Sequence, residues 1–321
     1  MMNGKLIVRS FGALASSQRV EQLMIDLRTS RRPKLDVGGT SPFHDWVLVR
    51  REGVELGFVD SEYQAGAARS RWGHGDLLLN QAYFYSGFDD IKSFADELPF
   101  DLTFGDSREI ARAKLVDFEA SRHSYRNDTW DVEGYRLSVM YTKAGAAIDR
   151  IACRMLASPI PREAQIQQPD LVRVVDTFGY ETRSPEFRAL WPHTLTDDDY
   201  RAVRDDGELD LTESYGATLG FAESGFGAVF RSITLHRNRD RESVGWSGSL
   251  PQGLDFEDSP DTLFEKIPRQ PIQQADSALT GHAVWHFDNY TLHVLYSNLD
   301  NRLLRVKMIA PGTWKCVEDS D

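Results

Sequence analysis

The chain has 321 residues, of which 41% are apolar, and its 49 acidic and 37 basic residues give a net charge of −12. The length suits about two domains of ordinary size, and the apolar content is sufficient for packed cores, which excludes an intrinsically disordered chain. The acidic excess argues against non-specific binding of nucleic acid or of an anionic membrane, and it suits a basic partner.

Cysteine content and targeting signals narrow the class of protein further. The two cysteines, Cys153 and Cys316, lie far apart and form neither a disulfide framework nor a zinc motif. The apolar stretch near the N-terminus, residues 6–8, is too short for the core of a signal peptide, and no run approaches the roughly 20 apolar residues of a membrane span. We therefore expect a cytoplasmic protein, and no motif indicates a metal or a cofactor.

The first elements in chain order are a helix and three strands. Apolar residues from Val20 to Leu27 follow the spacing of an amphipathic helix, which Ser16 and Ser17 can cap. The segment 61–76 has no periodicity and is expected to be an inserted, mobile loop without a match in the second half of the chain. Strands are expected at residues 46–49, 54–59 and 77–85, with a turn at 50–52.

The next stretch predicts a short strand, a helix and a loop. The strand is expected at residues 102–104. Asp106 and Ser107 cap a helix that extends to about Val116, and Glu109 lies where a capping box requires it. Residues 117–127 are expected to form a polar loop.

The segment from Trp130 to Tyr141 predicts a β-hairpin. Its turn is Glu133-Gly134, where glycine supplies a positive φ angle, and a closing strand follows at 148–155. A second hairpin runs from Trp285 to Tyr296 with Asp288-Asn289 at its turn, which places residue 286 opposite 291, and its closing strand is expected at 303–309. Period-2 alternation predicts a core face formed by Trp130, Val132, Tyr135, Leu137, Val139 and Tyr141.

These elements recur because much of the chain occurs twice. Leu98–Ser107 returns as Leu250–Ser259 at an offset of 152 residues, and the two hairpins are offset by 155. Upstream, Gly53–Phe58 matches Gly216–Phe221. Pro33 and Pro185 also fall in step at 152. What repeats is almost all apolar or turn-forming, so the duplication indicates a scaffold and a binding surface rather than a chemical site.

We therefore predict an α+β fold built by tandem duplication of helix-plus-antiparallel-β-meander units. The first repeat spans residues 1–157, a linker with three prolines spans 158–169, and the second repeat spans 170–321. Residues 170–178 are expected to be the counterpart of the first helix. Each repeat divides again into two smaller units, each a helix followed by antiparallel strands, so that the chain contains four such units.

The unit of a strand, an Asp/Ser-capped helix, a polar loop, a Trp-led hairpin and a further strand resembles β-lactamase inhibitor protein-like folds and the BamE/SmpA-type lipoproteins. The matching residues are 102–115 with 129–155, and 254–267 with 284–309. The resemblance implies helices behind an antiparallel sheet whose free face grips a protein partner. The longer unit also looks like cytoplasmic bacterial proteins that accompany polymorphic toxins, which implies an immunity-like role.

Histidines, serines and carboxylates do not combine into a known catalytic or metal-binding motif. His44-Asp45 and His74-Gly75-Asp76 are expected to be solvated loop residues, since a metal site needs three or four converging ligands. The run Asp197–Asp199 is explained more simply by capping of a helix than by calcium, because the EF-hand spacing is missing. We predict no catalytic residue and no metal ligand.

The outer face of the two hairpins is the candidate binding surface. His286 and His293 are expected to be diagonal neighbours within mutual reach, where a protein interface is favoured over a two-histidine metal site. Methionine, histidine and leucine on a solvent face suit an interface, although scattered exposed apolar side chains would give the same pattern. The predicted partner-binding residues are Arg136, Met140, His286, His293 and Leu295.

The sequence favours a stoichiometric protein-binding inhibitor rather than an enzyme. The expected example is a bacterial immunity protein that blocks the active site of a basic toxin, with its negative charge raising the encounter rate. Two alternatives stay open: an adaptor or assembly factor of a secretion or envelope system, and an enzyme whose site forms between the repeats. No nucleic-acid or membrane partner is expected.

Overall fold

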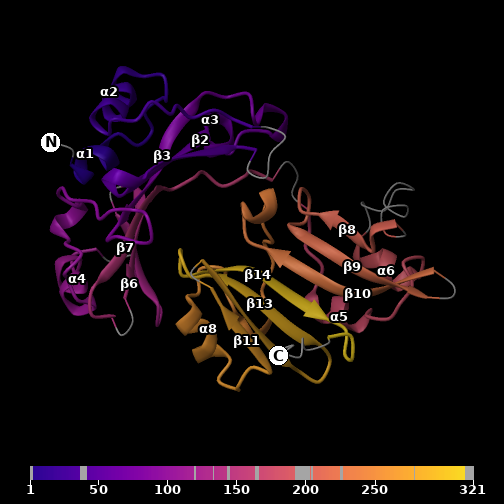
Figure 1. Ribbon diagram of the computed structural model, residues 1–321. Helices are drawn as coiled ribbons and strands as arrows, with labels where there is room; N and C mark the ends of the chain where they lie inside the picture. Colours follow the sequence, from indigo (N-terminus) through magenta and orange to yellow (C-terminus); the bar gives the residue numbers. More distant parts are fainter. Residues whose placement is uncertain are drawn as a thin grey trace. The chain divides into compact units, whose positions relative to one another are not determined.

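The computed structural model describes residues 3–314, with gaps at 37–41, 119–120, 133, 143–144, 163–165, 192–202, 204, 225–226 and 278. The chain divides into two compact units, residues 1–158 and 159–321 (Figure 1). This boundary is one residue from the expected end of the first repeat, and it assigns almost all of the expected linker to the second unit. The predictions made for Asp197–Asp199 and for Cys316 lie outside the described residues.

The first unit contains one antiparallel seven-stranded sheet with the order β1-β2-β3-β7-β6-β5-β4. A three-stranded and a four-stranded meander join where β3 pairs with β7. The strands match the prediction closely, including the hairpin register Val132 opposite Tyr135. Their bounds are β1 (His44–Val49), β2 (Val54–Asp60), β3 (Leu77–Tyr85), β4 (Ser121–His123), β5 (Asn127–Val132), β6 (Tyr135–Tyr141) and β7 (Ile148–Met155).

The second unit repeats this topology strand for strand. Its order, from the edge strand β8, is β8-β9-β10-β14-β13-β12-β11, and all neighbouring strands are antiparallel. The predicted α+β class and the tandem duplication are therefore confirmed. The bounds are β8 (Glu208–Leu211), β9 (Ala217–Ser224), β10 (Gly227–His236), β11 (Gln273–Asp276), β12 (Thr280–His286), β13 (Thr291–Ser297) and β14 (Arg302–Ile309).

The described helices are short, and the residue before each α-helix caps it with a side-chain oxygen. The caps recur in the duplication, as with Ser107 and Ser259. The α-helices are α1 (Gly4–Arg9), α2 (Gln18–Asp26), α3 (Ser61–Gln64), α4 (Arg108–Lys114), α5 (Leu171–Asp176), α6 (Pro185–Leu190) and α8 (Pro260–Lys266). The 3-10 turns are η1 (Arg50–Glu52), η2 (Arg69–Arg71), η3 (Pro99–Asp101), η5 (Asp240–Glu242) and η6 (Pro251–Gly253).

One face of each sheet packs against the helices and forms the core of its unit. In the first unit, Met24 of α2 and Ala111 of α4 share a cluster with Trp130. In the second, Phe187 of α6 and Leu263 of α8 share one with Trp285, Val294 and Met308. The predicted alternation of the first hairpin is confirmed, because its apolar positions all belong to this core or pack against it. The opposite face of each sheet carries polar side chains such as Ser138 and Lys307 together with apolar ones such as Met140 and Leu295.

The start of each repeat differs from the prediction. Helix α1 was not predicted, because six residues are too few to establish a helical period. In the structure, α5 is the counterpart of α1 rather than of α2. The residues after the two helices make the same bond to the sheet: the Gly12 N–H donates to the Leu79 carbonyl, and the Gly179 N–H donates to the Phe230 carbonyl, both at 2.8 Å.

The proline alignment fails for the same reason. Ser17 caps α2 and Ser184 caps α6, so Pro185 corresponds to Gln18 and not to Pro33. The two helices of the second repeat are thus shifted relative to the sheet residues that follow them, and a single offset cannot align the whole chain.

Residues 61–76 were expected to be a loop without regular structure, which is wrong. They contain α3 and η2, and Tyr63 and Trp72 are buried with their ring centroids 5.0 Å apart. Asp60 holds both ends of the segment, accepting hydrogen bonds from the Tyr63 and Gly75 backbone N–H groups. Aromatic packing rather than a helical period fixes this segment.

Two expectations between the strands are also wrong. Residues 102–104 form no strand, because positive φ angles at Phe100 and Asp101 turn the chain there. Conversely, the expected polar loop 117–127 contains the edge strand β4. An edge strand can be polar on both faces, so alternation gives no signal.

The turn of the second hairpin differs from that of the first. Gly134 has φ +87°, as expected, but neither Asp288 nor Asn289 has a positive φ angle. The loop is closed by the Phe287 N–H, which donates to the Tyr290 carbonyl at 2.9 Å. The predicted register survives, with His286 opposite Thr291 and Val284 opposite His293.

Candidate functional site

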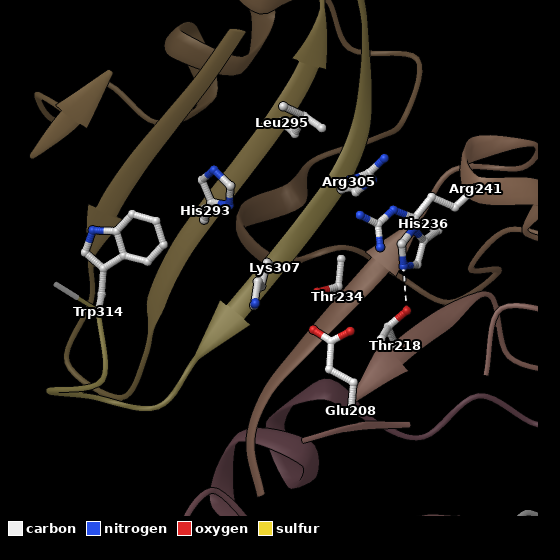
Figure 2. Close-up of a pocket in the computed structure, with 10 residues that line it drawn as sticks. All are labelled: Glu208, Thr218, Thr234, His236, Arg241, His293, Leu295, Arg305, Lys307 and Trp314. Atoms are coloured by element: carbon white, nitrogen blue, oxygen red, sulfur yellow. Dashed lines mark hydrogen bonds between the residues drawn. The ribbon is translucent and has the colours of Figure 1, made fainter. Parts of the chain in front are cut away.

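The polar face of the second sheet has a hollow with a volume of about 240 Å³ (Figure 2). Strands β8, β9, β10, β13 and β14 supply most of its side chains, η5 contributes one, and the segment after β14 contributes another. Alternation along the strands aims these side chains away from the core. The lining residues are Glu208, Thr218, Thr234, His236, Arg241, His293, Leu295, Arg305, Lys307 and Trp314.

The hollow is cationic. Arg305 forms a bidentate ion pair with Asp240, with Nε–Oδ2 and Nη2–Oδ1 distances of 2.6 and 3.0 Å. Lys307 and Arg241, by contrast, make no hydrogen bond or ion pair with any described residue. Glu208 supplies the only carboxylate among the lining side chains. Two cations therefore face the hollow against one unpaired carboxylate.

His293 lies between two other rings. Its centroid is 5.2 Å from that of His282 and 5.3 Å from that of Trp314, on which it stacks. Burial, and then the charges of His282, Lys307 and Arg305, lower the pKa of His293 to about 4. This imidazole is therefore neutral at neutral pH. The indole Nε1 of Trp314 is buried and has no hydrogen-bond partner among the described residues.

A hydrogen-bonded chain forms another wall of the hollow. Thr218 Oγ1 is 2.9 Å from His236 Nε2, and His236 Nδ1 is 2.9 Å from Asp240 Oδ2. Burial acts to raise the pKa of Asp240, but hydrogen bonds from His236 and Arg305 hold it below its usual range. The order alcohol, imidazole, carboxylate is that of hydrolytic triads. His236 itself is only 1% exposed.

The first unit has a polar link at the same position but with different chemistry. The strand register places Glu55 at the position of Thr218, and Tyr85 at the position of His236. The Tyr85 hydroxyl donates a hydrogen bond to the Glu55 carboxylate at 2.8 Å. Burial and this bond raise the pKa of Tyr85 above its usual range. Across both units, the position of the link between neighbouring strands recurs, whereas the acid–base groups do not.

Both units also have an arginine on the neighbouring strand, beside this hydrogen-bonded link. Arg150 occupies the position of Arg305, and its guanidinium lies 4.8 Å from the Tyr85 ring centroid. Ala152, however, stands where the second unit has Lys307. The Lys307 cation of the hollow thus has no counterpart at the matching strand position of the first unit.

The five predicted partner-binding residues are placed differently from one another. His293 and Leu295 line the hollow, and His286 is exposed, with Nδ1 2.8 Å from Thr291 Oγ1. Met140 is half-buried on the first sheet. Arg136 is only 4% exposed, and its guanidinium is paired with Asp131 at 2.8 Å.

The register confirms that His286 and His293 are diagonal neighbours. The ring contact of His293 is with His282, edge-on, on the other diagonal of the same strand pair. Twist of the strands brings one diagonal closer than the other, and a flat register diagram cannot show which.

The other candidates from the sequence stay apart. His74 is exposed, and His44 lies against the Tyr63 ring at 5.6 Å. Cys153 is fully buried, and burial raises the pKa of its thiol above its usual range. Among the described residues, no three His, Cys, Asp or Glu side chains are placed to share a metal ion. No helix in the described ranges has both the length and the apolarity to cross a membrane.

Sequence analysis missed the lining residues on β10 and β14. Arg305 and Lys307 alternate with the apolar Val306 and Met308 on a correctly predicted strand, so their shared face could have been inferred. The approach of Trp314 and η5 could not, because both follow turns rather than a periodic segment.

Comparison of the chain with family models, with curated proteins and with solved structures finds no match. The resemblance to β-lactamase inhibitor protein-like folds therefore stays a prediction.

Proposed function

We propose that the protein is a stoichiometric inhibitor that binds a protein partner through the polar sheet face of its second unit, as a bacterial immunity protein in the cytoplasm would bind a toxin. The observation that carries this proposal is the duplication of a sheet whose core face packs against helices such as α4 and α8. Such a sheet presents a broad, rigid surface, and rigid surfaces lose little entropy on binding.

The charge distribution supports a basic partner. Residues 1–158 contain 21 basic and 22 acidic residues, whereas residues 159–321 contain 16 and 27. Nearly all of the net charge of −12 therefore belongs to the second unit. Apart from Glu208, none of the described acidic residues of this unit lines the cationic hollow. They would therefore steer a basic toxin to the unit as a whole rather than into the hollow, and the association rate would fall as salt rises.

The test begins with capture of the partner by the tagged full-length protein, followed by titration calorimetry. We expect a basic protein at near-equal stoichiometry. Leu295→Glu, on the polar face, should weaken binding at least about tenfold. The matched control is Val172→Glu on α5, which replaces an apolar residue that is 68% exposed on the helix side of the sheet.

Two outcomes would contradict the proposal. Equal effects of Leu295→Glu and Val172→Glu would exclude the polar face as the contact surface. Co-elution of secretion or envelope components, without a toxin-like protein, would favour an adaptor or assembly factor instead.

One observation favours a second function, hydrolysis at Thr218. The chain from Thr218 through His236 to Asp240 places a hydroxyl beside a base that a carboxylate orients. Turnover of activated esters by the full-length protein would be abolished by Thr218→Val and lowered strongly by His236→Gln. Turnover that survives Thr218→Val would show that the hydrogen bonds from Thr218 through His236 to Asp240 only connect neighbouring strands, as the Glu55–Tyr85 bond of the first unit suggests.

A further inference from the structure

Several donors that line the hollow in the second sheet have no acceptor among the described residues. Besides the Lys307 ammonium and the Arg241 guanidinium, the Thr234 hydroxyl and the Trp314 indole N–H have no hydrogen-bond partner among the described residues. Polar groups at a concave site normally find a partner, and those that lack one within the protein are candidates to bind a ligand. The lysine, arginine and threonine side chains can donate to one acceptor in the hollow, whereas the indole nitrogen of Trp314 is on the side of its ring away from them (Figure 2).

We propose that this hollow is a binding site for an oxyanion group of the phosphate class. Lysine supplies a point charge and arginine a planar fork for such oxygens, while the Thr234 hydroxyl adds a neutral donor. The site lies in the unit that holds most of the negative charge of the chain, so its local positive character is not a consequence of composition.

The size of the hollow limits the ligand. A volume of about 240 Å³ is below that of pockets which enclose whole drug-sized molecules. It suits a free anion, or the anionic end of a larger molecule whose remainder stays outside.

The first unit provides an internal comparison. There, Ala152 replaces Lys307, Ser138 replaces His293, and the Glu55 carboxylate replaces the Thr218 hydroxyl. Trp46 stands at the register position of Glu208, so the corresponding place lacks the Lys307 cation while its one carboxylate comes from Glu55 instead. Only the second repeat is expected to bind the anion, with one site per chain.

His293 gives a readout that does not depend on activity. Its pKa is lowered by burial and by His282, Lys307 and Arg305, while Trp314 covers its ring. Phosphate bound beside Lys307, which is a monoanion in the pH range where His293 titrates, would offset part of those positive charges and raise the pKa of His293. Histidine NMR titrations of the full-length protein, with and without inorganic phosphate, would measure this shift.

Calorimetric titration with inorganic phosphate tests the binding itself. Lys307→Gln should weaken binding at least about tenfold, whereas Glu208→Gln, which removes the opposing carboxylate, should tighten it several-fold. Lys92→Gln is the matched control, since it removes the charge of an exposed lysine in the first unit. Circular dichroism would confirm that each variant is folded.

The outcomes are decisive without knowledge of any protein partner, so this inference does not depend on the proposed inhibitor function. The proposal is overturned if saturable binding is absent up to about 10 mM phosphate and phenyl phosphate, or if Lys307→Gln behaves like Lys92→Gln. Tighter binding of phenyl phosphate than of inorganic phosphate would identify the end of an organic molecule as the ligand, and equal binding would identify the free ion.

Discussion

Asp128 is the most strongly held carboxylate of the first unit. It is fully buried on β5 and accepts hydrogen bonds from Arg108 at 2.6 Å and from Arg112 at 2.8 Å. Burial acts to raise its pKa, but the bonds from Arg112, His123 and Arg108 outweigh burial and hold the pKa far below its usual range. The charge of this residue ties α4 to the sheet.

Acid should therefore destabilise the first unit through Asp128. A lowered folded pKa contributes stability that is complete above the ordinary aspartate value near 4 and is lost as pH falls toward the folded pKa. Asp128→Asn should cost about 3 kcal/mol or more at pH 7, because it leaves two arginines unpaired. It should also flatten the dependence of the unfolding free energy on pH between about 5 and 3.

Urea unfolding at several pH values measures both effects. Asp101→Asn is the control, since Asp101 is paired with Lys5 at the same 2.6 Å but its side chain is 84% exposed. We expect it to leave the unfolding midpoint almost unchanged. A parallel pH dependence of Asp128→Asn and the parent would show that folding does not lower the pKa of this carboxyl group.

Gly216 and Gly179 both have positive φ angles, and they allow the cost of backbone strain to be separated from the cost of steric overlap by a Cβ. Gly216 has φ +74°, and a Cβ there would overlap the backbone of Gly245 and Trp246. Gly179 has φ +89° but open space around it. Gly179→Ala should cost about 1 kcal/mol for the backbone conformation alone, and Gly216→Ala about 3 kcal/mol or more. Denaturant unfolding of both variants compares them, and equal costs would exclude the close approach.

At the scale of elements, the best-preserved part of the duplication is the loop that enters α4 and α8. The Asp258 carboxylate accepts from the Asp255 N–H at 2.7 Å and from Lys266 Nζ at 2.8 Å. Asp106 and Lys114 repeat the ion pair at 2.7 Å. Each lysine also donates to a carbonyl of the preceding 3-10 turn, which fixes the end of the helix to the loop at its start.

Loss of the Asp258–Lys266 ion pair and its hydrogen bonds should destabilise the whole second unit. Asp258 is 9% exposed, so Asp258→Ala removes a largely buried acceptor and should cost about 2 kcal/mol. Glu265→Ala, at an exposed position of the same helix, should have little effect. Thermal unfolding of the two variants decides the matter, and indistinguishable midpoints would mean that α8 is held by Leu263 and its apolar contacts alone.

Helices and strands whose apolar residues recur at a regular spacing could be predicted from the sequence. Elements that are fixed by a few individual contacts could not. Strand β3 was predicted at its observed bounds because it alternates and is flanked by turn residues. Helix α1 has only six residues, and strand β4 pairs as a polar edge, so neither produces a periodic signal. Residues 61–76 depend on contacts among Phe43, Tyr63 and Trp72, which are distant in sequence.

The candidate site was predictable only in part, for the same reason. His293 and Leu295 could be placed on the polar face of a hairpin whose register follows from its turn. Their neighbours come from β10, β14 and η5, and strand order across the sheet is not encoded in any one strand. Local alternation thus identifies the face but not the residues that share it.

At the scale of the molecule, each repeat contains its own core. The buried cluster of the first unit draws only on residues 7–153, and that of the second only on residues 174–308. Each cluster includes both a three-stranded and a four-stranded meander, so neither half of a repeat has a complete core alone. The repeat, rather than the smaller helix-plus-meander unit, is therefore the unit expected to fold.

The boundary between the repeats is hydrogen-bonded to the second unit. Ile160 is 5% exposed, and its N–H donates to Asn238 Oδ1 while its carbonyl accepts from Asn238 Nδ2, both at 2.9 Å. Arg162 adds a bond to the Gly245 carbonyl. Although the prolines of residues 158–169 suggest a linker, the start of this segment is held to the second unit by these hydrogen bonds.

A fragment of residues 159–321 should therefore be more stable than one of residues 170–321. Loss of the buried Ile160 side chain and of its paired bonds should lower the unfolding free energy by about 3 kcal/mol. Asn238→Ala completes a cycle: it should destabilise the longer fragment more than the shorter one, because only the longer one contains Ile160. If both fragments unfold at the same urea concentration, or if Asn238→Ala has equal effects in both, the segment is a linker after all.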